Sequence, residues 1–178
     1  MTVHAILIPN EIAARNIDSY VRSAVSAVAV DNGSLLMLTT YGAASGSSEV
    51  FTAVAASTSA GLTDVWIACE PELIWTGSYR GIDVDVRNYY TPIAKVFTVY
   101  KPQVHDIFTL STDGIYGTIG ANTFINAGNT GQLQPEWAAS IGSSVFAAKL
   151  LATTYISVGM GSIDSNRVVG YQFEVVHV

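Results

Sequence analysis

The stretch RGIDVDVRNYY offers the first side chains to consider for chemistry, because two carboxylates, Asp83 and Asp85, lie two residues apart in it. On a strand, residues two apart face the same side, so these carboxylates could share a metal ion or a proton. No third acidic or histidine ligand lies nearby, and Asp-x-Asp lacks the glycine and glutamate of a calcium loop. The flanking arginines can instead pair with the carboxylates and hold a loop in place. We therefore interpret residues 80–97 as an interface or loop-pinning segment, with the candidate residues Arg80, Asp83, Asp85, Arg87, Tyr89 and Tyr90.

The other reactive residue types show none of the common catalytic or ligand-binding spacings. His4, His105 and His177 form no HExxH motif, and His105 beside Asp106 is typical of a loop histidine with an acidic neighbour. No serine lies in GxSxG, and no glycine cluster fits GxxxxGK[ST] or GxGxxG. The single cysteine, Cys69, excludes a disulfide framework and a cysteine-based zinc site within one chain, and its apolar run DVWIAC predicts burial. We expect no catalytic residue, no metal site and no cofactor.

The elements that must position these residues are predicted to be strands. AVSAVAV and SLLMLTTY flank a tight-turn signature, which predicts a hairpin centred on Asp31-Asn32-Gly33. Further strands are predicted over EVFTAVAA, DVWIACE, AKVFTVYK and DIFTLS, and TDG predicts a turn. ELIWTGSYRG indicates a short strand and a turn, whereas residues 120–131 are rich in Asn and Gly and indicate a surface loop.

The last third of the chain holds one ambiguous stretch and the clearest strand. The alanines of PEWAASIGSSVFAAKLLATTYISV permit a helix, but the β-branched residues of LLATTYISV favour a strand. RVVGYQFEVVHV alternates with period two, and one face carries Val169, Tyr171, Phe173, Val175 and His177. Many short strands, frequent glycine turns and few credible helices predict a mainly β, single-domain β-barrel or sandwich with an irregular N-terminal arm.

The N-terminal residues are the least regular part of the predicted domain. NEIAARNIDSYVRSAV has no clean helical face, although HAILIP could form a short strand. We therefore divide the chain into an arm or entry segment, residues 1–25, and one β-rich domain, residues 26–178. The arm is expected to reach a neighbouring subunit and to order on contact. Its candidate contacts are Ile6, Ile8, Ile12, Ile17 and Tyr20.

Composition limits the classes of partner. Only 12% of residues are charged, against about 25% in ordinary proteins, and eight basic and fourteen acidic residues give a net charge of −6. Without a run of Lys or Arg we expect no nucleic-acid partner. The uncharged residues 114–135 are rich in Gly, Asn and Thr and indicate loops rather than a membrane span, and no secretion signal is visible, which predicts a soluble product made in the cytoplasm. A charge-poor surface suits docking to other proteins, and an ordinary extracellular-type β domain has the same composition.

The order of motifs resembles the small head decoration (cement) proteins of tailed bacteriophages. The segments that carry the resemblance are VDNGSLLML, EVFTAVAA, LTDVWIACEPELIW, YRGIDVDVRNYYTPIAKVFTVYKPQVHDIFTLSTDGI and GYQFEVVHV. The similarity covers residues 17–113 and 167–178. In that family an ENG hairpin comes first, a PE step follows an apolar strand, and a tract of the type D…AG…R.Y.L..GDIFSVT.DAI precedes a closing FEVV. This chain departs from the tract at Pro92-Ile93 and at His105-Asp106-Ile107, and residues 114–160 match no part of the pattern.

The resemblance implies a non-enzymatic structural protein of the virion, made in the host bacterial cytoplasm, that binds the outer capsid surface and stabilises the shell. Its implied partners are the major capsid protein and further copies of itself, with a homotrimer favoured because capsid lattices present three-fold positions. Two alternatives stay open. One is a phage tail or fibre module that binds host glycans through exposed aromatic residues among Trp66, Trp75, Trp137 and the nine tyrosines. The other is a β-barrel hydrolase that uses Asp83, Asp85 and His105.

Overall fold

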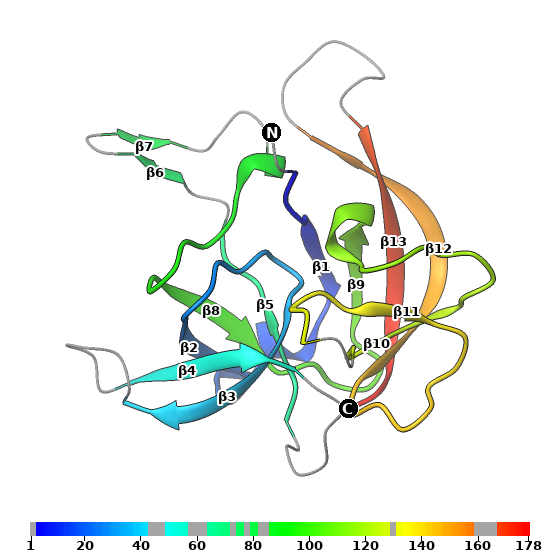
Figure 1. Cartoon of the computed structure of the whole chain (residues 1–178), viewed down its shortest axis with the longest axis horizontal. Coiled ribbons are helices and arrows are strands. Elements are labelled where there is room, and N and C mark those ends of the chain that lie inside the picture. The colour runs from blue at the N-terminus through cyan, green and yellow to red at the C-terminus, as the bar shows by residue number, and fades with distance from the viewer. Residues whose placement is uncertain are drawn as a thin grey trace.

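The computed structural model describes residues 3–42, 49–56, 64–71, 74–76, 79–81, 86–128, 131–158 and 167–178 (Figure 1). Within these ranges the chain consists of strands joined by loops and short 3-10 turns, so the prediction of a mainly β fold is confirmed. The elements in chain order are β1 (Leu7–Glu11), η1 (Ala13–Arg15), η2 (Asp18–Tyr20), β2 (Val21–Ser26), β3 (Leu35–Tyr41), β4 (Val50–Ala55), β5 (Trp66–Ala68), β6 (Ile74–Thr76), β7 (Tyr79–Gly81), η3 (Val86–Asn88), β8 (Val96–Tyr100), β9 (Ile107–Ser111), η4 (Thr112–Gly114), β10 (Phe124–Asn126), β11 (Glu136–Ala138), β12 (Ala147–Ser157) and β13 (Arg167–His177).

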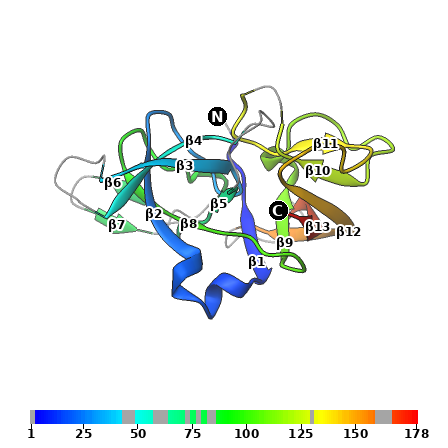
Figure 2. The same ribbon diagram turned by 90° about the horizontal axis from the view of Figure 1, so that it is seen from below.

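The strands form a closed barrel beside an open sheet. The barrel runs β2-β4-β3-β5-β8, with β2 parallel to β4 and antiparallel to β8. The six-stranded sheet runs β1-β9-β13-β12-β10-β11, and all of its pairs are antiparallel. A separate hairpin pairs β6 with β7. Figure 2 shows the barrel and the sheet side by side, with β1 at their boundary.

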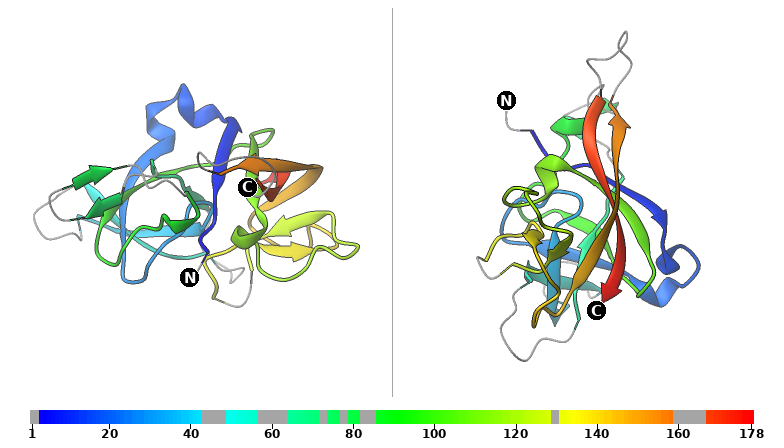
Figure 3. Two further views of the ribbon diagram at one scale, coloured as in Figure 1. Left: turned by 90° about the horizontal axis from the view of Figure 1, so that it is seen from above. Right: turned by 90° about the vertical axis from the view of Figure 1, so that its right-hand side faces the viewer.

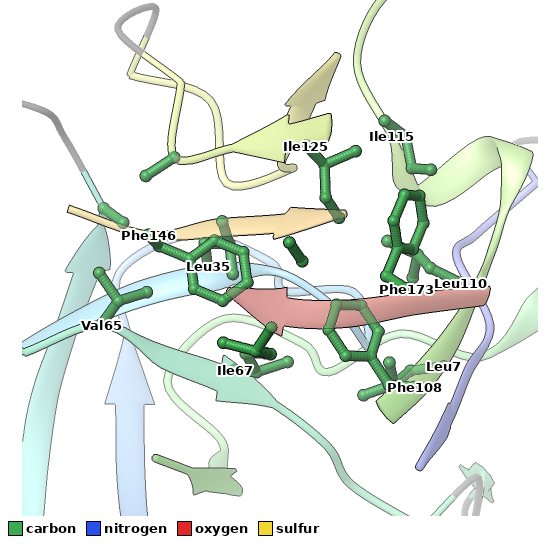
Figure 4. Packing of buried hydrophobic residues seen from close by; sticks show 14 of the residues in the cluster. Leu7, Leu35, Val65, Ile67, Phe108, Leu110, Ile115, Ile125, Phe146 and Phe173 are labelled. Carbon is green, nitrogen blue, oxygen red and sulfur yellow. The ribbon is translucent and has the colours of Figure 1, made fainter. Parts of the chain in front are cut away.

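Because successive residues of the barrel strands point to opposite faces, these strands contribute side chains to two separate hydrophobic cores. On β3, β5 and β8, alternate residues point into the barrel and out toward the six-stranded sheet. Leu36, Ala68 and Val99 belong to the cluster inside the barrel, whereas their neighbours Leu35, Ile67 and Tyr100 belong to the cluster between barrel and sheet. Because both faces of these strands are buried, their sequences are nearly continuous apolar runs. The larger cluster receives from the sheet the side chains Leu7, Phe108, Leu110, Phe173 and Val175 (Figure 4).

The C-terminal hairpin of β12 and β13 is the longest element. The predicted strand over RVVGYQFEVVHV is confirmed, and Phe173 and Val175 are fully buried on the face that alternation assigned to them. The ambiguous stretch before it forms β11 and β12, so its β-branched residues decided the outcome over its alanines. The two strands twist together along one side of the molecule (Figure 3).

Two predictions about local structure need correction, and a third is confirmed. The tight turn at Asn32-Gly33 is present, but β2 and β3 do not pair as a hairpin, because β4 lies between them in the barrel. Residues 120–131, predicted to be a surface loop, contain β10, whose Ile125 is fully buried. The predicted TDG turn is the 3-10 turn η4.

The N-terminal segment is not a free arm within this chain. β1 pairs with β9 at the boundary of the sheet, and β2 closes the barrel against β8. Between them, the amide of Lys101 donates to the carbonyl of Tyr20 at 2.7 Å. The segment lacks a strong periodic pattern because its strands are short and separated by two 3-10 turns. In the described residues no helix is long and apolar enough to cross a membrane.

Candidate interaction surface

In the segment singled out from the sequence, Arg80 and Gly81 lie in β7, and the described residues 86–97 form a tightly folded loop that leads into β8. The amide of Tyr89 donates to the carbonyl of Val86 at 3.2 Å, which closes η3. Pro92 and Lys95 then close a four-residue turn, in which the Lys95 amide donates to the Pro92 carbonyl at 3.2 Å. Ala94 has a φ of +60°, a backbone conformation that residues other than glycine rarely adopt unless neighbouring contacts stabilise it. The Ala94 amide donates to the Ser26 carbonyl at 3.0 Å, and this contact helps to hold the turn.

Histidine 4 joins this loop to two other segments, and we call the arrangement the His4 junction. Its Nδ1 lies 2.8 Å from Oδ1 of Asp31, and its ring stacks on Tyr90 with the ring centroids 4.6 Å apart. Its amide donates to the carbonyl of Arg87 at 2.8 Å. The N-terminal segment, the turn after β2 and the loop after η3 are therefore held together by side chain and backbone at one point. The loop-pinning role expected for residues 80–97 stays a prediction, and the contacts described at this point come from His4 and Asp31.

Beside the His4 junction, two antiparallel stretches and the residue before the second of them, Tyr90, place four large apolar side chains in solvent. Val25 lies opposite Val96 in the barrel, and Val30 and Thr91 exchange two backbone hydrogen bonds of 3.0 and 2.8 Å. Residues 25–30 and 91–96 therefore run side by side, as Figure 1 shows at the start of β8. The exposed side chains, which we call the apolar ridge, are Val28 (52% exposed), Tyr90 (41%), Ile93 (61%) and Val96 (51%). Single exposed apolar residues are common, but four of them on one hydrogen-bonded support indicate a preformed contact surface.

The residues predicted from the sequence for this segment fall into three groups. Asp83 and Asp85 lie outside the described residues, and so does the side chain of Arg80, whose backbone lies opposite Trp75 in the β6–β7 hairpin. The ion pairs expected of these residues stay a prediction. Arg87 is half-buried in η3, Tyr89 is buried, and Tyr90 is exposed on the apolar ridge.

The five residues predicted to make arm contacts are divided between core and surface. Ile6 is only 3% exposed and lies in a small core with Ile156 of β12 and with Val158, which directly follows β12. Ile12 and Tyr20 are partly buried against the main core. Ile8 and Ile17 alone are exposed, at 38% and 40%. Three of the five candidates therefore stabilise the chain itself, because the segment is packed between the two sheets.

The segment 103–106 combines a buried carboxylate with an exposed histidine. Both oxygens of the Asp106 carboxylate accept backbone hydrogen bonds, from Ala13 at 2.9 Å and from Gln103 at 2.8 Å. His105 has a φ of +77° and its Nδ1 lies 2.9 Å from Oε1 of Glu174, with 81% of the histidine side chain exposed. An open cleft of about 490 Å³ lies between this segment and residues 10–16. Because Asp106 is occupied by two structural hydrogen bonds and His105 pairs with Glu174, the geometry supports the interpretation of His105 as a loop histidine.

One buried polar group in the interface between barrel and sheet lacks a partner. Tyr100 is 2% exposed, and its hydroxyl has no hydrogen-bond partner among the described residues. Burial raises the pKa of Tyr100 well above 10, and the nearby Cys69 and Asp106 raise it further because their negative charges disfavour a phenolate. Cys69, for which burial was predicted, is half-buried and packs against the main core. The phenol of Tyr100 is therefore uncharged in the folded chain at neutral pH.

Burial excludes two of the three tryptophans as exposed binding residues. Trp66 and Trp137 are 7% and 9% exposed, so two of the three tryptophans proposed for a glycan platform lie in the cores. Within the described ranges, no three residues among His, Cys, Asp and Glu come together as a metal site. A scan against protein-family models, a search of curated proteins and a search of solved structures each found no match to this chain.

Proposed function

We propose that this protein is a non-enzymatic decoration protein, which binds the outer surface of a tailed-phage capsid and stabilises the shell. The observation that carries the proposal is the apolar ridge, which a hydrogen-bonded loop holds in solvent on a chain with only 12% charged residues. Such a surface can bury apolar area against a capsid protein while desolvating few charges. The resemblance of the motif order to phage decoration proteins supplies the identity of the partner.

Docking through the apolar ridge makes the interaction insensitive to salt. Screening weakens contacts between exposed charges, and few charges are available at this surface. The protein should therefore stay attached to particles in moderate salt. We further propose that it binds as a symmetric cluster, most simply a trimer at a three-fold or quasi-three-fold lattice position, with a total buried area above roughly 1,000 Å² for each stable attachment.

The test is binding of the purified chain to shells of the phage that encodes it, prepared without this protein. Ile93→Asp places a carboxylate at the most exposed point of the apolar ridge, where burial of the isoleucine contributes about 1.5–3 kcal/mol. We expect its affinity for shells to fall by more than about tenfold, measured by co-sedimentation over a concentration series. Val178→Asp, at the 40% exposed last residue, is the matched control and should bind like the unaltered chain.

Cryo-electron microscopy of the decorated shells distinguishes the proposed function from its rivals. We expect density for the protein at repeated lattice positions over the whole capsid surface. Failure of the unaltered chain to bind shells at micromolar concentration would overturn the proposal. So would its location in a few copies at the tail tip, where an adsorption module belongs.

A further inference from the structure

Among the residues that the structure describes, none pairs with one edge of β12 over more than half of its length. On one side it pairs with β13 from end to end, but on the other side β10 covers only Ala147–Lys149. One more hydrogen bond, from the amide of Leu150 to the carbonyl of Thr123 at 2.8 Å, extends this cover by a single residue. Beyond it, residues 151–157 make no backbone hydrogen bond on that side with any described residue, and we call them the open edge of β12.

The open edge is held in a regular strand conformation by its pairing with β13. From Ala152 opposite Gln172 to Ser157 opposite Arg167, the pairing with β13 runs without a register shift. Ile156, 5% exposed, packs in the small core that also contains Ile6. Figure 3 shows this end of the hairpin standing beyond the rest of the sheet. The edge therefore offers a regular row of alternating backbone donors and acceptors, which need a hydrogen-bond partner other than this sheet.

The open edge of β12 lacks the features by which proteins protect free strand edges, and β1 shows those features in the same sheet. On β1, Pro9 has no amide to offer, the Arg15 guanidinium donates to the Pro9 carbonyl at 2.7 Å, and a bulge precedes the charged Glu11. The open edge of β12 reads LATTYIS, with no charge and no proline. Its only irregularity is the bulge at its first residue, Leu151. Tyr155, at 66%, is the most exposed large apolar side chain described.

We propose that the open edge of β12 binds the same edge of a second copy of this chain, as an antiparallel continuation of the six-stranded sheet. The middle residue of the edge is Thr154, and a two-fold axis through it uses all seven residues. In this register Thr153 of each copy lies opposite Tyr155 of the other, and Ala152 lies opposite Ile156. Aromatic and β-branched residues are favourable neighbours across strands, and no like charges meet. A second copy satisfies two open edges at once, which is why it is favoured over an unrelated extended peptide.

This inference does not depend on the proposed function, because it concerns a two-fold contact of the purified chain, whereas the proposed trimer is a cluster bound at a lattice position of the capsid. Its test is a pair of double variants that depend on the register. Thr153→Lys with Tyr155→Lys places like charges opposite each other twice across the two-fold axis, whereas Thr153→Lys with Tyr155→Glu places opposite charges there. The matched control, Thr40→Lys with Tyr41→Lys, makes the same chemical change at exposed positions of β3 in the barrel.

Mass measured by light scattering over a concentration series gives the first readout. We expect the unaltered chain to reach twice its 18.9 kDa, and the lysine–lysine variant to associate at least about tenfold more weakly. The lysine–glutamate variant and the β3 control should associate like the unaltered chain. Hydrogen exchange of the unaltered chain gives a second readout that needs no substitution, because amides of residues 151–157 should exchange more slowly at high protein concentration.

Any one of three results would overturn the proposal. One is a mass of 18.9 kDa at about 100 µM with no concentration-dependent protection of residues 151–157. Another is an assembly of any size that the lysine–lysine variant weakens no more than the β3 control does. Loss of association in both the lysine–lysine and the lysine–glutamate variants would also count against it, because the proposed register predicts opposite results for the two.

Discussion

Substitution of Tyr100 by phenylalanine should stabilise the protein. The hydroxyl of Tyr100 is buried in the core between barrel and sheet and has no hydrogen-bond partner among the described residues. A buried hydroxyl without a partner costs about 1–3 kcal/mol relative to one that water can solvate. Phenylalanine keeps the ring and leaves only an oxygen-sized space, roughly 10 Å³, which costs about 0.2 kcal/mol. We therefore expect the free energy of unfolding to rise by about 1–3 kcal/mol.

The same substitution should change how stability depends on pH. Burial raises the pKa of Tyr100 in the folded chain, while in the unfolded chain the phenol titrates near its ordinary value of about 10. Below that value the phenol is neutral in both states and pH has no effect through this group. Above it, the unfolded state releases a proton that the folded state keeps, so unfolding becomes easier by about 1.4 kcal/mol per pH unit. The stabilisation by Tyr100→Phe should therefore be constant from pH 7 to 9 and grow between pH 10 and 11.

Urea unfolding of both proteins at each pH, followed by tryptophan fluorescence, measures these differences. Tyr41→Phe is the control, because the Tyr41 side chain is 59% exposed and its hydroxyl reaches solvent. It should change the free energy of unfolding by less than about 0.5 kcal/mol at every pH. A Tyr100→Phe protein that is less stable than the unaltered chain at pH 7 would refute the reasoning, since the hydroxyl would then have a partner that matters.

Two further substitutions test contacts that hold the fold. Asp106→Ala removes the acceptor of two backbone hydrogen bonds from a buried site and should lower the free energy of unfolding by about 3 kcal/mol. The control is Asp113→Ala, at an exposed position, which should lower it by less than about 0.5 kcal/mol in the same urea titration. Gly33→Ala and Gly117→Ala carry the same backbone cost, because both glycines have a φ near +87° (+86° and +88°). A Cβ at residue 33 would also collide with Leu110, while one at residue 117 meets nothing within 4 Å. Gly33→Ala should therefore be the less stable of the two by at least about 1 kcal/mol, and equal thermal midpoints would contradict the close packing at residue 33.

The sequence predicts the position of a strand well where apolar and polar residues alternate strongly. It predicts poorly which other strand that strand pairs with. The strand over residues 167–177 follows from period two alone. The pairing partner of β2 cannot be predicted in this way. The turn at Asn32-Gly33 is predicted correctly, but the pairing of β2 depends on β4, which lies later in the chain. Gly33 is needed at that turn for its φ of +86° and for the approach of Leu110, neither of which requires a hairpin.

The candidate surfaces were only partly visible in the sequence. The segment 80–97 stood out through its charges, yet the described contacts at the His4 junction come from His4 and Asp31, which are distant from that segment in the chain. Ile93 could have been found as the residue at the corner of the Pro92–Lys95 turn, a position that usually faces solvent. The open edge of β12 could not be found in this way, because it exists only where β10 ends beside β12.

The packing of the N-terminal segment decides which kind of docking this chain can use. An arm that orders on contact loses conformational freedom at that moment, which weakens binding for a given buried area. Here β1 is already paired with β9, and Ile6 and Leu7 are buried, so that ordering has taken place during folding. The apolar ridge and the open edge of β12 lie on elements fixed by the same packing, and preformed surfaces lose little freedom when they bind. On the symmetric shell that we propose as the partner, each can therefore be small and still effective, because contacts between neighbouring copies raise the effective concentration of every further contact.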